Sequence, residues 1–167
     1  FNFDVIVRIT SDCPLIDPEI IDKVLEKFLT EDYDYVTNTF PRTYPKGLDV
    51  EVFSFSVLER MWINAKLPSE REHVTQFILN HDEFRIGNVE HQNDLSQLRW
   101  TLDQKEDLEF LLNIIKGIDS RPILMNNILN LLEKNPELKE INSGIDPDQG
   151  IKKSKEEDKA FLKENNN

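Results

Sequence analysis

The chain opens on a run of β-branched residues that favours a buried strand over any other structure. Residues 3–9 read FDVIVRI, with Val5, Ile6 and Val7 in succession. An unbroken apolar run of this length is typical of a parallel strand covered on both faces. The chain therefore starts inside a sheet. We expect that an upstream segment is missing. The alternative is a natural N-terminus at such a strand.

Strand and helix patterns alternate along the first 134 residues. Further strands are expected at residues 33–37, 48–53, 84–89 and 98–102. Helices are expected at 18–29, after Ser54 or Ser56, from 68 to about 80, at 104–116 and at 122–134. The first of these helices has Asp17 as its expected N-cap and Pro18 at its first position. The alternation predicts an α/β fold with a mostly parallel sheet.

The composition changes after Lys134, which divides the chain into two parts. Residues 1–134 hold the apolar periodicity of one domain, whereas residues 135–167 are rich in Asn, Lys, Glu and Asp. We expect this polar tail to be mobile or to fold onto a partner, with a short helical turn near PELKEI.

The charge of the chain excludes some classes of partner. Twenty Lys and Arg face 32 Asp and Glu, which gives a net charge of −12. Such a surface repels nucleic acids and anionic membranes. Cys13 is the single cysteine, and the opening residues show no basic start or cleavage site. We therefore expect an intracellular, cytoplasmic protein that binds neither nucleic acid nor membrane.

Two acidic residues follow predicted strands, where α/β folds bind their ligands. Asp12 comes after the first strand, and Asp103 comes after the strand at 98–102. A pair of carboxylates suits Mg²⁺, which takes few protein ligands and keeps positions for water and phosphates. Each has a structural alternative: Asp103 and Glu106 have the spacing of a capping box, and Asp12 could form an Asx-turn.

A loop and a strand carry four further candidates for substrate binding. Arg42 and Lys46 lie in the proline-rich loop at 38–47, where they could bind an anionic sugar or simply face solvent. Asp49 and Glu51 share one face of the next predicted strand. Two like charges on one face require water, a cation or hydroxyl donors, and sugar hydroxyls would suit them.

Two more candidates lie in the sequence SEREHVT, at the start of a predicted helix. Arg71 and His73 could bind an anion there, because a helix N-terminus favours negative charge. The neighbouring glutamates already supply that charge, so solvated helix pairs are the alternative. His73 could equally be a structural hydrogen-bonding residue.

Four segments in order carry a resemblance to a known family. The segments are RITSDCPLIDPEIID (8–22), YPKGLDVEVFSFSVLER (44–60), LPSEREHVTQFI (67–78) and LRWTLDQKEDLEF (98–110). Together they resemble the spore-coat polysaccharide biosynthesis protein F family, which is similar to the cytidylyltransferases that make CMP-activated acid sugars. The resemblance covers residues 1–115 well.

The resemblance implies a Rossmann-like, three-layer nucleotidyltransferase fold, incomplete at its N-terminus. It implies a sugar hydroxyl attacking the α-phosphorus of a nucleoside triphosphate, with CTP as the expected nucleotide and pyrophosphate leaving. Asp12 in SDCPL and Asp103 in WTLD are then the expected catalytic Mg²⁺ ligands. Ser11 stands where the family usually has glycine. The segment at 38–97 is expected to contact both the sugar and a second subunit of a homodimer.

One family feature has no counterpart in the sequence, the Arg- and Gly-rich loop that cradles the triphosphate. We therefore expect the 167 residues to be inactive by themselves. Two other readings stay open: a non-catalytic sugar-binding or dimerisation fragment, and a glycosyltransferase of related fold, which normally carries a DxD-type motif.

Overall fold

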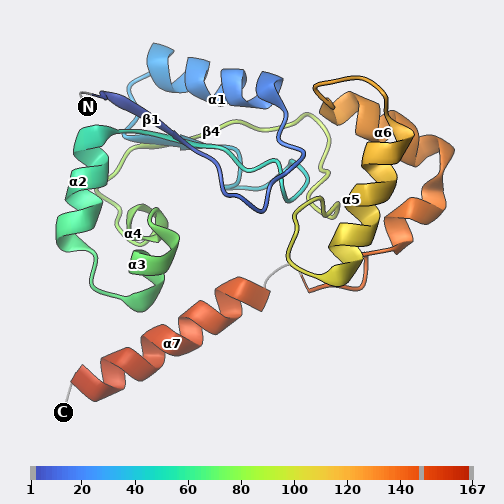
Figure 1. Cartoon of the computed structure of the whole chain (residues 1–167). Coiled ribbons are helices and arrows are strands. Elements are labelled where there is room, and N and C mark those ends of the chain that lie inside the picture. Colours follow the sequence, from blue (N-terminus) through green and yellow to red (C-terminus); the bar gives the residue numbers. More distant parts are fainter. Residues whose placement is uncertain (1–2, 147–148, 166–167) are drawn as a thin grey trace.

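The computed structural model describes residues 3–146 and 149–165, and its centre is a four-stranded sheet in the order β1-β3-β2-β4 (Figure 1). The strands are β1 (Val5–Arg8), β2 (Tyr35–Thr37), β3 (Glu51–Ser54) and β4 (Ile86–Asn88). Strand β3 is antiparallel to both of its neighbours, whereas β2 and β4 are parallel. Three strands therefore run in one direction, as a mostly parallel sheet requires, but only one neighbouring pair is parallel.

Helices cover both faces of the sheet, which makes the α/β architecture three-layered. The helices are α1 (Pro18–Thr30), α2 (Phe55–Asn64), α3 (Pro68–His73), α4 (Gln76–Leu79), α5 (Lys105–Gly117), α6 (Met125–Lys134) and α7 (Gln149–Asn165), with a 3-10 helix η1 (Pro136–Glu140). Figure 1 shows α1 over one face, α2 to α4 on the other side, and α5 and α6 grouped beyond one end of the sheet. None of the helices in the described ranges is long and apolar enough to cross a membrane.

The first helix begins as the sequence predicts, and its cap does more than the sequence shows. Asp17 is the N-cap, Pro18 follows it, and the backbone N–H of Glu19 donates to Asp17 Oδ1 at 2.8 Å. The other carboxylate oxygen accepts the N–H of Met125, the first residue of α6, at 2.6 Å. One buried carboxylate therefore satisfies the starts of two helices that lie 108 residues apart.

Strand β1 differs from the prediction of a strand covered on both faces. It lies at the edge of the sheet with β3 as its partner, and Val7 is 39% exposed. The prediction is wrong for this strand because an edge strand can leave one face in solvent. The β-branched run identifies the strand but cannot give its place in the sheet.

Two further predicted elements are shorter or broken in the structure. The expected strand at 98–102 is reduced to an isolated bridge between Arg99 and Lys46. The expected helix from 68 to about 80 is divided at Val74, whose φ of 60° no right-handed helix accommodates. The break places Thr75 beside the sheet, where its hydroxyl donates to Glu51 Oε1 at 2.5 Å.

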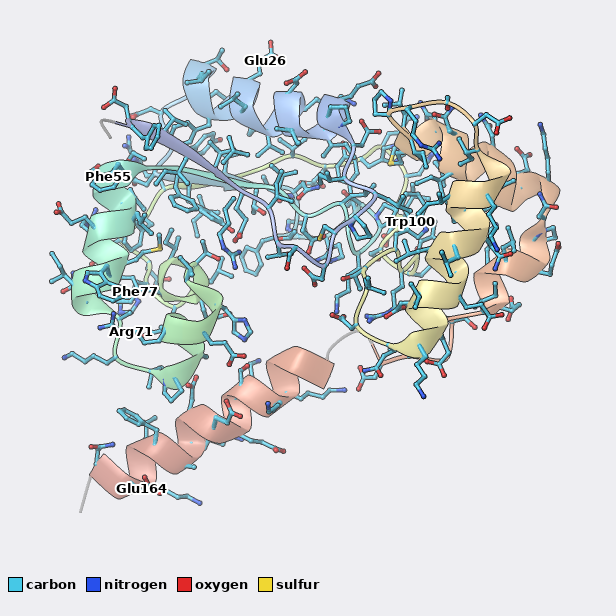
Figure 2. The ribbon with its side chains drawn as sticks, in the orientation of Figure 1. Glu26, Phe55, Arg71, Phe77, Trp100 and Glu164 are labelled. Carbon is cyan, nitrogen blue, oxygen red and sulfur yellow. The ribbon has the colours of Figure 1, made fainter. Side chains whose placement is uncertain are left out.

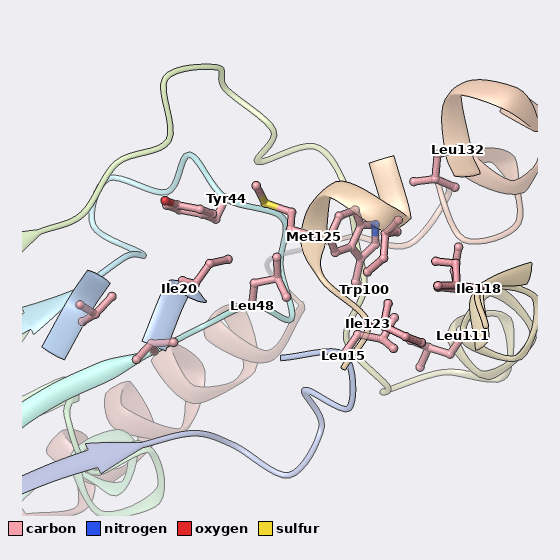
Figure 3. Close-up of a cluster of buried hydrophobic side chains, with 14 of the residues drawn as sticks. Leu15, Ile20, Tyr44, Leu48, Trp100, Leu111, Ile118, Ile123, Met125 and Leu132 are labelled. Atoms are coloured by element: carbon pink, nitrogen blue, oxygen red, sulfur yellow. The ribbon is translucent and has the colours of Figure 1, made fainter. Parts of the chain in front are cut away.

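The apolar core forms two clusters, one on each face of the sheet. The larger cluster joins α1 to α5 and α6 through Leu48 and Trp100, both of which are fully buried. Figure 3 shows this cluster extending from Ile20 through Leu48 and Trp100 to Leu132. The smaller cluster packs α2 and α4 against the other face, around Phe53 and Phe77.

The polar segment at 135–167 contains regular structure in its described part. Helix η1 follows α6, and α7 packs along α3 below the sheet in Figure 1. The backbone N–H and the hydroxyl of Ser69 donate to Asp158 at 3.0 and 2.6 Å. His73 Nε2 lies 2.7 Å from the hydroxyl oxygen of Ser154. The segment therefore folds back on the domain through polar contacts.

Candidate active site

The loop after β1 meets the segment at 98–103 at the C-terminal edge of the sheet. The backbone N–H of Leu102 donates to the carbonyl of Asp12 at 2.9 Å. The hydroxyl of Thr101 donates to Asp12 Oδ2 at 3.0 Å and to its carbonyl at 3.1 Å. Asp103 is the next residue along this segment. Residues 89 positions apart are thus tied together directly beside both candidate aspartates.

Asp12 is held as an ionised carboxylate. Burial by itself would raise the pKa of Asp12, but hydrogen bonds from Thr10 and Thr101 and the charge of Lys46 hold it below its ordinary value. Asp12 cannot form the Asx-turn that was its structural alternative. An Asx-turn requires a backbone N–H two residues on, and that residue is Pro14, which has none.

Asp103 presents a half-open carboxylate beside two cations. Its side chain is 40% exposed, accepts a hydrogen bond from Arg99 Nη2 at 2.7 Å and lies 4.0 Å from Lys46 Nζ. The capping alternative for Asp103 is wrong, because the N-cap of α5 is Gln104. The carboxylate that accepts the N–H groups of Asp103 and Gln104 belongs to Asp107, at 3.0 and 2.9 Å.

A buried polar network that the sequence analysis missed supports Asp103. Asp107 is fully buried and accepts hydrogen bonds from Arg99 Nε and Nη2, both at 2.8 Å, and from Asn142 at 3.0 Å. Burial would raise the pKa of Asp107, but these bonds and the two backbone N–H groups outweigh it and lower the pKa to about 2. Arg99, Asp103 and Asp107 are spaced four residues apart, which is a signal of contact between their side chains. The signal was missed because this spacing is typical of one helix, and Arg99 lies before helix α5.

Lys46 reaches this site because a glycine follows it. Gly47 has a φ of +104°, and a Cβ there would lie 2.5 Å from backbone atoms of Trp100 and Thr101. Only glycine permits both the conformation and the contact. The backbones of Lys46 and the segment at 98–100 are joined by two hydrogen bonds of 2.9 and 2.6 Å. The loop at 38–47 is therefore fastened against the segment that carries Asp103.

Arg42 and Asp49 form a pair close to the loop that carries Asp12. The guanidinium of Arg42 donates to both carboxylate oxygens of Asp49, at 2.6 and 2.8 Å, and the N–H of Gly47 donates to Asp49 at 3.2 Å.

Cys13, the residue after Asp12, is buried. Burial, followed by the charges of Asp49 and Asp12, raises the pKa of Cys13 to about 11. The buried thiol is thus protonated at neutral pH, which fits a space-filling residue rather than a nucleophile.

Glu51 finds its cation and hydroxyl donors within the protein. Its carboxylate pairs with Arg8 and accepts the hydroxyls of Tyr35 at 2.6 Å and Thr75 at 2.5 Å. These contacts join three strands to the turn between α3 and α4. Asp49, two residues earlier, bonds to Arg42 and to the N–H of Gly47. The two predicted sugar ligands therefore do not act as one pair.

Arg71 and His73 are directed to other parts of the molecule. Arg71 donates to the carbonyl of Trp62 at 2.9 Å and stacks over its ring, on the outer side of α2. Figure 2 shows Arg71 far from Trp100, which precedes the segment at 101–103. His73 contacts α7 through Ser154. The structure thus gathers Asp12, Asp103 and Lys46 and leaves Arg71 outside the group.

The charged residues of the described ranges include no group of three or more His, Cys, Asp or Glu that could hold a metal ion. Two carboxylates are what the site offers. This donor set fits Mg²⁺, which is commonly bound by one or two carboxylates together with water and substrate phosphates. It does not fit a closed all-protein site such as that of structural zinc.

Comparison with known proteins assigns the fold to a family. Residues 1–142 match the family profile described as cytidylyltransferase, which is most of the chain. The chain belongs to the cytidylyltransferase family. The match includes every candidate residue at the sheet edge, from Asp12 to Asn142. It also agrees with the Rossmann-like nucleotidyltransferase fold that the sequence motifs imply.

Two curated proteins match over most of this chain and part of their own length. An uncharacterised protein of Methanocaldococcus jannaschii is 38% identical over 148 residues, which are 87% of this chain and 60% of that protein. The spore coat polysaccharide biosynthesis protein SpsF of Bacillus subtilis is 31% identical over 140 residues, 80% of this chain and 56% of that protein.

A solved structure of a cytidylyltransferase from Leptospira borgpetersenii matches with a TM-score of 0.78 and 34% identity. The match covers 81% of this chain and 58% of that one. The chain thus spans somewhat less than two thirds of the length of the relatives it matches.

Proposed function

We propose that the protein carrying this chain transfers a cytidylyl group from CTP to a sugar substrate and releases pyrophosphate. The observation that carries the proposal is the junction of the loop after β1 with the segment at 98–103, beside Asp12 and Asp103. Membership of the cytidylyltransferase family and the likeness to SpsF support nucleotidyl transfer in polysaccharide biosynthesis. The proposal further specifies that the sugar is an acid sugar and that the product is used to make spore-coat polysaccharide.

The residues at the sheet edge have distinct tasks in this proposal. Asp12 and Asp103 would hold Mg²⁺. When bound, the ion supplies the positive charge that offsets the phosphates and the transferring phosphoryl group. Lys46 adds a second positive charge beside Asp103. Arg99 and Asp107 fix the position of Asp103, and Thr101 fixes that of Asp12.

The remaining candidates have support of different kinds. Arg42 and Asp49 lie close to the Asp12 loop and could bind the sugar if their mutual ion pair opens. Glu51 is already satisfied by three protein groups. His73 and Arg71 would reach a sugar only after leaving α7 and Trp62.

The direct test is a pyrophosphate-release assay on the complete gene product, with CTP and the other nucleoside triphosphates against a panel of acid and neutral sugars. We expect turnover that requires Mg²⁺ and prefers CTP. Binding of Mn²⁺ as a spin probe for Mg²⁺ should weaken about tenfold or more in Asp12→Asn, whose matched control is Asp119→Asn in an exposed loop.

The outcomes of this assay separate the alternatives. Binding of sugar without pyrophosphate release would support the non-catalytic module. Release of nucleoside diphosphate from a nucleotide sugar would support a glycosyltransferase, although the family match favours nucleotidyl transfer. Unchanged Mn²⁺ binding in Asp12→Asn would remove Asp12 from the metal site.

We also propose that the segment at 38–97 mediates a homodimer. Its helix α2 exposes three large apolar side chains, Phe55 at 49%, Trp62 at 72% and Ile63 at 68%. Exposed apolar groups on a single helix often mark an interface. We expect Ile63→Asp to convert a dimer to a monomer by analytical ultracentrifugation, whereas Glu59→Asp on the same helix should not. A gene product that is monomeric before mutation would contradict this proposal.

A further inference from the structure

A cavity of about 240 Å³ lies between the segment at 96–100, the helices α5 and α6, and the chain at 139–145. Trp100, Phe110 and Leu132 contribute apolar wall, and Asn142 and Ser143 contribute polar wall. This volume is below the usual range of about 300–1,000 Å³ for sites that bind drug-sized ligands. The cavity therefore suits a small ligand.

The side chains that line this cavity include three cations and no carboxylate, although Arg99 and Lys46 pair with carboxylates outside the lining. Lys46, Arg99 and Lys139 line it, and no Asp or Glu is among the lining residues, although the whole chain has a net charge of −12. Lys139 makes no ion pair or hydrogen bond within the part of the chain that the structure describes. A cavity with one sign of charge concentrates ions of the other sign.

Arg99 has one nitrogen left for a ligand. Its side chain is 8% exposed, Nε donates to Asp107, and Nη2 donates to Asp107 and Asp103. No acceptor in the described ranges bonds to Nη1, and the structure leaves no fully enclosed side-chain nitrogen without a partner there. Nη1 must therefore meet solvent, and the cavity that Arg99 lines is where an acceptor can reach it.

We propose that this cavity binds a small oxyanion, a phosphate or carboxylate group, through Arg99 Nη1 and Lys139. Arginine presents N–H groups that match both kinds of oxyanion, and a buried guanidinium binds them with little competition from water. Asn142, which also lines the cavity, already donates to the carbonyl of Arg99 and to Asp107, and these hydrogen bonds fix the position of its side chain. Anion binding here needs neither a bound metal nor the proposed transfer reaction, although Arg99 and Lys46 also contact Asp103.

Trp100 provides a direct readout because it lines the cavity and is 1% exposed. The chain has two tryptophans, and Trp62→Phe removes the exposed one. In this background we expect inorganic phosphate or acetate, added at constant ionic strength, to change the Trp100 emission along a saturable curve. Chloride should not do so. The more effective of the two anions identifies the ligand as a phosphate or a carboxylate.

A pair of lysine variants locates the site. Lys139→Gln removes one charge-assisted hydrogen bond and should weaken anion binding about tenfold, as measured by Trp100 emission and by calorimetry. Lys134→Gln, a matched change outside the cavity, should leave it unchanged. Near-ultraviolet circular dichroism verifies that both variants are folded. The absence of a saturable response to either anion, or equal affinities in the two variants, would overturn the proposal.

Discussion

Asp107→Ala is expected to lower the free energy of unfolding by about 3–5 kcal/mol, because it leaves the buried Arg99 without its main counter-charge. Asp107 is fully buried and accepts bonds from Arg99, Asn142 and two backbone N–H groups. Urea unfolding followed by tryptophan fluorescence measures the change. Glu106→Ala, at the exposed neighbouring position, should stay within about 0.5 kcal/mol. A loss of less than about 1 kcal/mol in Asp107→Ala would contradict the importance of the network.

The same carboxylate predicts how stability changes in acid. The pKa of Asp107 is lowered to about 2 in the folded chain from an ordinary value of 3.8, against the effect of burial and because of its hydrogen bonds. Its contribution is therefore fully present above about pH 4 and is lost as the pH falls through about 2. This difference corresponds to about 2 kcal/mol. The contribution should disappear from the pH profile of Asp107→Asn.

Asp103→Asn in the complete gene product should reduce pyrophosphate release about a hundredfold or more, comparable to removing one main electrostatic stabiliser of a transition state. A hundredfold loss corresponds to about 2.7 kcal/mol in the activation free energy. Asparagine can still accept the hydrogen bond from Arg99 Nη2, so the loop should keep its conformation. The stability of this variant by urea unfolding should therefore stay close to that of the parent.

The control for Asp103→Asn is Asp119→Asn, which removes one negative charge from an exposed loop. It should leave turnover unchanged. Near-normal turnover of Asp103→Asn would return Asp103 to a structural role in positioning Arg99. Loss of turnover together with a large loss of stability would assign the effect to folding, and Mn²⁺ binding by the folded fraction would then decide the role of Asp103 in the metal site.

Local signals in the sequence predicted the elements that local forces determine. Helix α1 starts at Asp17 and Pro18 because the cap and the proline act within a few residues of each other. The strand at 98–102 was predicted wrongly, because strand propensity gives no information about the partner. Here the partner is a single bridge to Lys46, made possible by Gly47.

The candidate site shows the same division between local and distant contacts. Asp12 and Asp103 are visible in the sequence because they follow apolar runs. The group that fixes Asp103 is not visible, since Asn142 reaches Asp107 over 35 residues and Arg99 precedes the helix that carries Asp107. The Asn142 contact leaves no sequence signal, and the four-residue spacing of Arg99, Asp103 and Asp107 suggests a helix of which Arg99 is not part. Sugar binding by Arg71 was predicted from its place at a helix start, and in the structure its side chain contacts Trp62.

The double cap at Asp17 has a consequence during synthesis on the ribosome. Asp17 can begin α1 as soon as Glu19 is available, but its second oxygen waits for Met125, 108 residues later. At about 5–20 residues per second, that delay is on the order of 5–20 s. For most of this delay the larger apolar cluster lacks α5, and for all of it the cluster lacks α6. The nascent chain therefore has a long interval in which a chaperone could bind its exposed apolar residues before the site at Asp12 and Asp103 can assemble.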